Sequence, residues 1–507
     1  MRQGWWRRRQ ALAIALVVLA GSLLRVVHLF VLDISQPMRA GGLFLEFSQQ
    51  IVAGSFRLPG TIPFYTESGI PFAYPPLPFY VQAILLRFFP HAEIAIANLL
   101  PPLVSIASLP LMWLLARELG ITRGEHIGAL AAFALLPPAY LEQIESAGLA
   151  EALGTLAILA LLIGLVRAYR TDAVRDYAWA GAALSLCVLS SPGSAYGGVL
   201  LAVVFGFTKL STAQGWKLFG QRSARLALCA LVGAALSAPY WAVVNGRYGT
   251  RFFIEATSYQ QAGLLETARP FLDFNVAQGS VSLLWNGLIL LGLLLALQKR
   301  RWAIVIAFVL LFAVPREGVW LVAGPAALLA GIGVEATLDW AQNFGGSRGR
   351  LAVFGGLALY MATFSVLVAA NFVARYPQGY WAGTIEAMHW VRTGLPQETA
   401  LIVVSEDAVR EWAPYVTRHT VLNVVQGTEW VPAKNQEITA GNQALEACED
   451  IECAAGAVRA NDSKDGLVLL VDRRHADAWG GEAALETVGF DLIWANAWML
   501  IANVASE

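Results

Sequence analysis

Long apolar runs recur through the first 372 residues of the chain. A helix needs about 20 apolar residues to cross a hydrocarbon core about 30 Å thick. About eleven runs approach or reach that length, so the pattern predicts a polytopic α-helical membrane protein with about eleven transmembrane helices. The runs occupy residues 11–31, 94–116, 126–141, 152–168, 177–191, 194–208, 225–244, 281–297, 302–315, 319–334 and 351–372.

The pattern changes after residue 372. Residues 381–396 have a helical period and end in Gly-Leu-Pro, which is a stop signal for a helix. Short β-type runs follow at 400–407 and 465–474, and residues 490–504 offer two more. No glycine-rich nucleotide loop is present. These runs predict a small α/β domain.

The loop predicted between the first two spans, residues 32–93, is too apolar to be a solvated linker. Its segment 42–54 has the amphipathic pattern of a helix that lies in the membrane surface. One face holds Leu43, Phe44, Phe47 and Ile51, and another holds Glu46, Gln49 and Gln50. Residues 75–89 form a second such piece, opened by prolines at a permitted helix start. We expect interfacial helices here, and the second piece is also able to enter the bilayer.

Composition and charge give the chain an orientation. Hydrophobic residues make up 57% of the chain and charged residues 14%, against roughly 25% charged in soluble proteins. Residues 1–371 hold 26 Lys and Arg against 17 Asp and Glu, whereas residues 372–507 hold 9 against 19. With the N-terminus inside, 18 of those 26 basic residues fall in cytoplasmic segments.

We therefore predict an integral protein of a bacterial-type plasma membrane with a cytoplasmic N-terminus. A transmembrane domain over residues 1–372 would be followed by an extracytoplasmic α/β domain over residues 373–507. No long basic run is present, which argues against nucleic acid as a partner.

Four cysteines are too few for a disulfide scaffold, and no CxxC spacing accompanies them. Cys448 and Cys453 lie in CEDIEC on the predicted oxidising side, where they either close a small loop or remain free thiols. Cys187 and Cys229 lie within spans and are interpreted as packing residues.

Six acidic residues of the transmembrane domain form a group on the predicted outer side. They are Asp33 after the first span, Glu46 and Glu67 in the long loop, and Glu142, Glu145 and Glu151 between the third and fourth spans. Carboxylates at an apolar boundary are costly, and several around one water-filled site suit proton transfer or a divalent cation. The alternative is a set of solvated loop acids. The cofactor stays open between none and a divalent metal, for which Asp33, Glu46 and Glu145 are candidate ligands.

Arginine supplies the complementary charge. Arg316 lies in a very short outer turn, Val314-Pro315-Arg316, where its planar guanidinium group suits a phosphate. In the alternative interpretation, its side chain extends from a helix end to the membrane surface. Arg25 and His28, near the outer end of the first span, are able to contact the same head group. A structural pairing is the plainer interpretation of both.

These features together resemble the GT-C superfamily of membrane glycosyltransferases. The chain has a basic N-terminus, one span, a long first outer loop, the element Phe72-Ala73-Tyr74-Pro75-Pro76-Leu77, acids at the second outer loop and a late Pro-Arg turn. Within the superfamily the chain is most similar to protein O-mannosyltransferases and lipid A aminoarabinose transferases, over roughly residues 10–335.

The resemblance implies an inverting hexosyl- or pentosyltransferase. A sugar would move from a polyprenyl-phosphate carrier to a lipid, glycan or protein acceptor on the outer face, without a nucleotide sugar. A carboxylate would take the acceptor's proton, cationic or metal contacts would stabilise the leaving phosphate, and apolar grooves between spans would receive the prenyl chain.

The sequence departs from the family pattern in two places. The acid usual at the start of the first interfacial helix is missing from residues 39–43, so Asp33 or Glu46 must replace it, and we narrowly favour Glu46, near Glu145 and Glu151. The basic residue that often precedes Pro-Pro-Leu is Tyr74 here. Phosphate binding would then rest more on Arg316, and the other substrate-binding candidates are Tyr74, Glu67, Arg25 and Glu142.

The WWDxG motif of the oligosaccharyltransferase branch is absent, which disfavours transfer of a whole glycan. Two other classes of function stay open. One is a transporter or flippase, although the polar groups gather at one face rather than at the midplane. The other is a catalytically inactive scaffold whose outer domain binds a partner.

Overall fold

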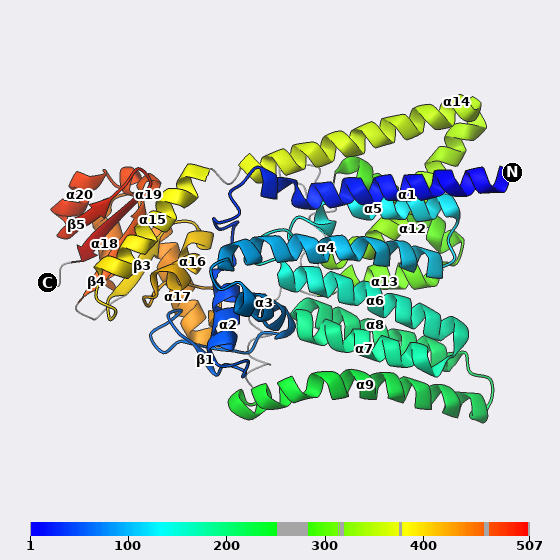
Figure 1. The fold of residues 1–507 in the computed structure, drawn as a ribbon, viewed down its shortest axis with the longest axis horizontal. Coiled ribbons are helices and arrows are strands. Elements are labelled where there is room, and N and C mark those ends of the chain that lie inside the picture. The colour runs from blue at the N-terminus through cyan, green and yellow to red at the C-terminus, as the bar shows by residue number, and fades with distance from the viewer. Residues whose placement is uncertain are drawn as a thin grey trace.

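The computed structural model describes residues 2–250, 282–312, 314, 319–374, 378–460 and 466–504. A bundle of long helices forms one part of the molecule, and a smaller α/β domain covers one end of the bundle (Figure 1). The N-terminus lies at the opposite end (Figure 1).

Each predicted apolar run contains a helix of the bundle. The described helices are α1 (Arg2–Val26), α4 (Glu93–Glu118), α5 (Arg123–Leu135), α6 (Leu149–Thr171), α7 (Val174–Ser190), α8 (Pro192–Ser211), α9 (Trp216–Tyr248), α12 (Leu283–Gln298), α13 (Trp302–Phe312) and α14 (Ala323–Ala374). Helix α14 contains the last two runs. It consists of two helical pieces, which are separated by non-helical dihedral angles at Gly346. Within the described residues, six helices are long and apolar enough to cross a membrane. The total of about eleven spans stays a prediction.

The surface of the bundle is apolar where a soluble protein would be polar. On α1, Leu12, Leu16, Leu19 and Leu23 lie on one face and are each more than half exposed. A stripe of this kind faces lipid rather than water. Inside the bundle, small residues let helices approach closely: a Cβ at Gly331 of α14 would lie 2.4 Å from the backbone nitrogen of Ala129 in α5.

The first long loop folds into η1 (Val27–Phe30), α2 (Gly42–Ala53), β1 (Thr61–Ile62), β2 (Ile70–Pro71) and α3 (Leu77–Phe88). A helix is present in each of the two predicted segments. Helix α2 does not lie open on a surface, however, because α3 and the C-terminal domain cover it: Leu43, Phe47 and even Glu46 are at most 1% exposed. The apolar face that suggested a membrane surface packs against protein instead.

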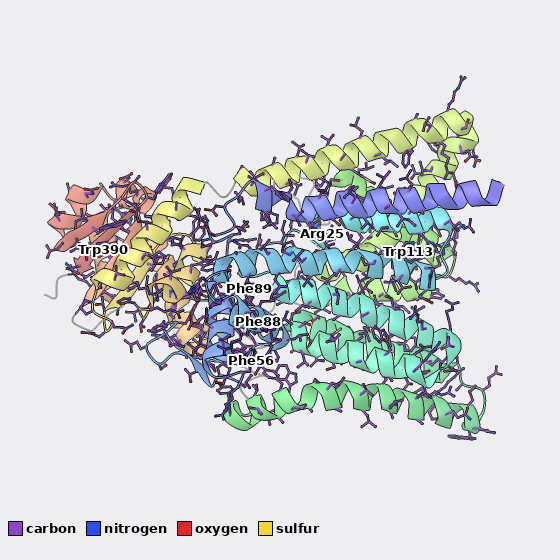
Figure 2. The ribbon with its side chains drawn as sticks, viewed as in Figure 1. Arg25, Phe56, Phe88, Phe89, Trp113 and Trp390 are labelled. Carbon is purple, nitrogen blue, oxygen red and sulfur yellow. A yellow bond between two sulfur atoms is a disulfide. The ribbon has the colours of Figure 1, made fainter. Side chains whose placement is uncertain are left out.

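Exposed aromatic side chains mark the boundary between the bundle and the C-terminal domain. Phe56, Phe88 and Phe89 all lie there and remain exposed (Figure 2). Phenylalanine is among the residues with which interfacial helices enter the boundary between head groups and acyl chains, so these rings suit a position near a membrane surface.

The C-terminal domain contains the four predicted β-type runs. Its elements are α15 (Gln378–Gly394), β3 (Ala400–Val404), α16 (Asp407–Thr417), η4 (Thr428–Trp430), α17 (Pro432–Glu446), α18 (Ile451–Ala460), β4 (Leu467–Asp472), α19 (Arg473–Ala478), α20 (Glu482–Thr487), β5 (Phe490–Ala495) and β6 (Met499–Val504). The sheet order is β3-β4-β6-β5, with β3 parallel to β4 and the other two pairs antiparallel.

Alternating residues of this sheet face two different layers. In β3, Leu401 and Val403 belong to the core shared with α2, α3 and α16, whereas Ile402 and Val404 face a core shared with α18. Because side chains of a strand alternate between faces, one face of the sheet serves the domain itself and the other joins it to the first long loop. The domain is therefore packed onto the loop rather than tethered to it.

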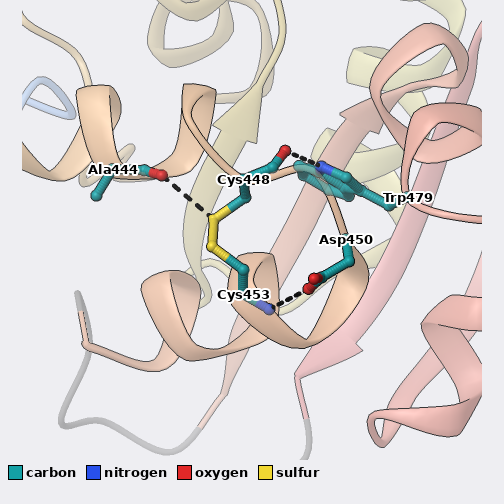
Figure 3. Close-up of a disulfide and its surroundings, with 5 residues drawn as sticks. All are labelled: Ala444, Cys448, Asp450, Cys453 and Trp479. Atoms are coloured by element: carbon teal, nitrogen blue, oxygen red, sulfur yellow. Dashed lines mark hydrogen bonds between the residues drawn. A yellow bond between two sulfur atoms is a disulfide. The ribbon is translucent and has the colours of Figure 1, made fainter.

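Cys448 and Cys453 form a disulfide, with Cα atoms 5.4 Å apart (Figure 3). The indole of Trp479 donates a hydrogen bond to the carbonyl of Cys448, and the backbone N–H of Cys453 donates one to Asp450 (Figure 3). The small closed loop anticipated for these two residues is confirmed.

Candidate active site

Two loops meet at the end of the bundle that faces the C-terminal domain. They are residues 33–41, after η1, and residues 140–148, before α6, and we call them the paired loops. Ser146 joins them, since its hydroxyl accepts the N–H of Met38 at 3.0 Å and its own N–H donates to the Met38 carbonyl at 3.1 Å. The amide of Asn98 donates to the carbonyls of Ile34 and Gln36 at 2.9 and 2.8 Å, and its oxygen accepts from Ser146. A single residue of α4 thus holds both loops in register.

A buried arginine supports the paired loops from below. Arg25 is fully buried. Its guanidinium group donates hydrogen bonds of 3.0 to 3.5 Å to the hydroxyl of Ser105 and to the backbone carbonyls of Gly21, Phe133, Ala134 and Ala139. Figure 2 shows it inside the bundle beside α4. Because all five N–H donors of the fork have protein partners, Arg25 has no donor left for a head group in this arrangement.

The support continues through neutral polar side chains. Ser105 donates to the amide oxygen of Gln143 at 2.8 Å, and the amide nitrogen of Gln143 donates to Thr155 at 2.8 Å. This chain runs from the first span to α6 and fixes the middle of residues 140–148. The sequence analysis did not identify Asn98, Gln143 and Ser146 as residues that hold the loops. The signal that was available is that amide and hydroxyl side chains lie in or beside apolar runs, where such groups often form hydrogen bonds between helices.

Two acids of the second paired loop lie together with a basic residue of the first. Arg39 and Glu145 form an ion pair at 2.6 Å. The side chain of Glu142 is exposed, yet surrounding protein atoms and the negative charge of Glu145 raise its pKa to about 7, while Arg39 acts in the opposite direction. A carboxyl group whose pKa is raised toward neutrality is suited to proton transfer.

Asp33 stands at the start of the first paired loop. Its carboxylate is exposed and accepts hydrogen bonds from the hydroxyl and the N–H of Ser35, at 2.7 and 2.9 Å. These bonds hold the pKa of Asp33 below its ordinary value. Asp33 is therefore ionised at neutral pH and is a weaker base than Glu142.

Glu46 lies elsewhere, at the contact between α2 and the C-terminal domain. It is fully buried, and its two oxygens are engaged by Arg418 at 2.5 Å and by Gln50 at 2.7 Å. Arg418 in turn lies over the ring of Tyr415. The structure brings Glu46 together with Arg418 rather than with Glu145.

The start of α2, where the family acid was missing, is occupied by the C-terminal domain. A Cβ at Gly42 would lie 2.7 Å from the Cα of Trp412, so no larger residue fits there without a shift of α16. The carboxylate of Glu411 accepts the backbone N–H groups of Gly41 and Leu43, at 3.1 and 3.3 Å. The acid at this helix end therefore comes from residue 411, which no pattern around residues 39–43 predicts.

The remaining candidates are spread over the same end of the molecule. Tyr74 belongs to an aromatic cluster, with its ring 5.4 Å from Trp430 and 5.8 Å from Phe44. Glu67 is exposed between β1 and β2, and Glu151 is half-buried in the first turn of α6, directly after the second paired loop. Arg316 lies outside the described residues.

The described acids do not fit a metal centre. Throughout the part of the chain that the structure describes, no three His, Cys, Asp or Glu side chains come together as metal ligands, and Asp33, Glu46 and Glu145 have separate partners. A bound cation needs several converging oxygen ligands.

Comparison with known proteins identifies the fold. No protein-family model and no curated protein sequence matches the chain. Among solved structures, ArnT from Cupriavidus metallidurans bound to undecaprenyl phosphate is 15% identical, with a TM-score of 0.59 over 100% of this chain and 99% of that one. The oligosaccharyltransferase of Archaeoglobus fulgidus, in its apo form, is 13% identical, with a TM-score of 0.63 over 98% of this chain and 74% of that one.

The protein has the GT-C fold. The arabinofuranosyltransferase AftD from Mycobacteria adds a third similar GT-C structure, 16% identical with a TM-score of 0.56, and 99% of this chain covers 40% of it. These likenesses cover nearly the whole of this chain, with the helix bundle and the C-terminal domain both included.

Proposed function

We propose that the protein is an inverting glycosyltransferase that moves a sugar from a polyprenyl-phosphate carrier to an acceptor on the outer face of the membrane. The observation that carries this proposal is the group of carboxylates on the paired loops, in a chain with the GT-C fold. Solved structures of that fold hold a dolichol-phosphate in one case and undecaprenyl phosphate in another. Their ligands are lipid phosphates, which supports a donor of the same class here.

Glu142 is our proposed general base, with Asp33 as the second candidate. Glu142 would accept the proton of the acceptor hydroxyl as that oxygen bonds to the anomeric carbon, and the bond from that carbon to the phosphate oxygen would break with its electron pair leaving on the phosphate. A pKa of about 7 lets Glu142 be ionised before the reaction and hold the proton afterwards. Arg39, beside Glu145, offers positive charge at the same loops, and Arg316 remains the predicted phosphate contact.

The proposed orientation places the N-terminus in the cytoplasm and the C-terminal domain outside. Two features support it. The loops at the end of the bundle far from that domain hold most of the basic residues, as positive-inside segments do. The Cys448–Cys453 disulfide belongs to the C-terminal domain, and disulfides persist in oxidising compartments.

The test uses the full-length protein in lipid nanodiscs with sugar-labelled undecaprenyl and dolichyl phosphate monosaccharides, each offered with a membrane lipid extract as acceptor. We expect release of free polyprenyl phosphate by the unaltered protein. Glu142→Gln should reduce turnover by about 10²–10⁴ with little change in carrier binding, which is the usual cost of losing a general base. Glu437→Gln, the same change on exposed helix α17, is the matched control.

Three outcomes discriminate among the candidates. Loss of turnover in Asp33→Asn but not in Glu142→Gln would move the base to Asp33. Loss of turnover in Glu46→Gln, with an unchanged unfolding midpoint, would assign the role of general base to Glu46. Absence of carrier consumption in the unaltered protein with every donor, or movement of intact carrier across the bilayer, would reject the transferase in favour of a scaffold or a flippase.

A further inference from the structure

A cavity of about 410 Å³ opens at the end of the bundle far from the C-terminal domain. It lies between α4, α6, α8, α13 and α14, and its size falls in the range of small-molecule sites. Leucine, valine, isoleucine and phenylalanine side chains form most of its wall, including Leu162, Leu201 and Ile304. The wall therefore suits a hydrocarbon chain.

The rim of the cavity is basic. Arg170, Arg300 and Arg301 line it, and a second, more polar cavity of about 630 Å³ adjoins it through Arg170. Glu118 also lines both cavities, but Arg167 and Arg170 already pair with it, at 2.8 and 3.2 Å. The rim of the cavity, where its apolar wall ends, therefore has more basic than acidic side chains.

Arg300 is the most available of these cations. Its side chain is exposed, and within the described residues it makes no ion pair with an acid. Arg301 instead pairs with Glu125 at 2.9 Å, which holds the start of α13 against α5. Arg300 can therefore take an external anion without breaking a contact of the fold.

Two amphipathic aromatic residues place the rim at the level of lipid head groups. Trp302 and Tyr169 both line the cavity and are 52% and 43% exposed. Tryptophan and tyrosine concentrate at the membrane–water interface, where the ring meets hydrocarbon and the polar atom meets water. The cavity thus opens at an interface, with cations outward and apolar wall inward.

We propose that this cavity binds an acidic phospholipid of the leaflet opposite the C-terminal domain. One acyl chain lies against the apolar wall, and the phosphate lies at Arg300 with Arg170 and Arg301 beside it. The site is separate from the paired loops, because the first α6 residue that lines the cavity, Leu162, lies roughly 20 Å of helix beyond Leu149, where α6 begins. The bound lipid joins α13 to α6 and α8, and the proposal does not depend on the transfer reaction.

The test measures lipid binding by native mass spectrometry of the full-length protein titrated with phosphatidylglycerol or phosphatidylcholine. We expect a preference for phosphatidylglycerol in the unaltered protein. Arg300→Gln should weaken phosphatidylglycerol binding about fivefold, the factor that corresponds to about 1 kcal/mol per basic residue near an anionic lipid surface. Arg348→Gln, an exposed arginine of α14 outside the cavity, should leave the binding unchanged.

A second variant tests the apolar part of the site. Ala303→Trp enlarges an exposed lining residue and fills the cavity, so binding of phosphatidylglycerol should fall while the unfolding midpoint is kept. Equal binding of the two lipids, or no effect of Arg300→Gln, would overturn the proposal. So would full displacement by soluble glycerophosphate, which would mean a free anion site, or a preference for undecaprenyl phosphate, which would mean a carrier site.

Discussion

Arg25 illustrates how one residue within an apolar run can be structural rather than functional. A charged group inside a membrane protein is expected to face partners or a polar cavity, and Arg25 satisfies that rule with four backbone carbonyls and Ser105. Its ring contacts with Phe133 and Tyr140 add to the same packing. The partners come from α5, η2 (Pro137–Ala139) and α4, so the arginine ties the first span to the base of the second paired loop.

We predict that Arg25→Lys destabilises the protein. Lysine keeps the charge but has three donors in place of five, so buried carbonyls lose partners, at about 1–3 kcal/mol for each group left unsatisfied. The unfolding midpoint in detergent should fall clearly, whereas Arg117→Lys on the exposed side of α4 should change it little. Loss of undecaprenyl phosphate binding at unchanged stability would instead make Arg25 a ligand residue.

The roles of individual acids were only partly predictable. Sequence spacing placed Glu142 and Glu145 on one loop, and the structure keeps them beside each other and beside Arg39. The environment of Glu46 depends on Arg418, which is 372 residues away in the chain. A single sequence contains no signal for that pair, because neither residue is part of a local pattern.

At the scale of elements, the N-terminal end of α2 is completed by a different domain. Glu411 of α16 accepts the N–H groups that a capping side chain would normally accept. Burial raises the pKa of Glu411 to about 7, with a further contribution from Asp407, while the two N–H groups act in the opposite direction. The contact between α2 and α16 therefore depends on pH.

We predict that burying Glu411 in this contact costs less stability in mild acid. The folded pKa lies above the ordinary value of 4.5, so the contribution of Glu411 to stability is fully present below about pH 4.5 and is lost as the pH rises through about 7. The difference in stability is about 3 kcal/mol. Glu411→Gln should flatten the part of the unfolding profile between pH 5 and 8 that belongs to this residue. An identical profile for the variant and the unaltered protein would contradict the prediction.

Helices and strands were the most predictable elements. The apolar runs and the β-type runs all correspond to elements of the structure, because helix and strand periods are local properties of the sequence. The environment of α2 was not predictable from the same pattern. Leu43, Phe47 and Ile51 give an identical signal whether they face lipid or α16, and only the folded domain decides between these surroundings.

At the scale of the whole molecule, the proposed orientation can be tested by labelling. Cysteine placed at Glu437 in the C-terminal domain should react with a membrane-impermeant maleimide on intact cells. Cysteine placed at Arg348, at the far end of the bundle, should react only after permeabilisation. Both positions are exposed, and Cys187 and Cys229 are buried, so the background is low. Reaction of the Arg348→Cys variant on intact cells would reverse the topology.

The junction between α2 and Glu411 also constrains how the protein is made. Gly41 and its partner Glu411 are 370 residues apart, which at 5–20 residues per second is roughly 20–70 s of synthesis. Throughout that interval α2 can pack on its own loop, α3 and α4, but its apolar residues lack the cover of α16. The final burial of α2 is consequently a late event in synthesis. A chain that is released before α16 has been made leaves the α16-facing side of α2 uncovered.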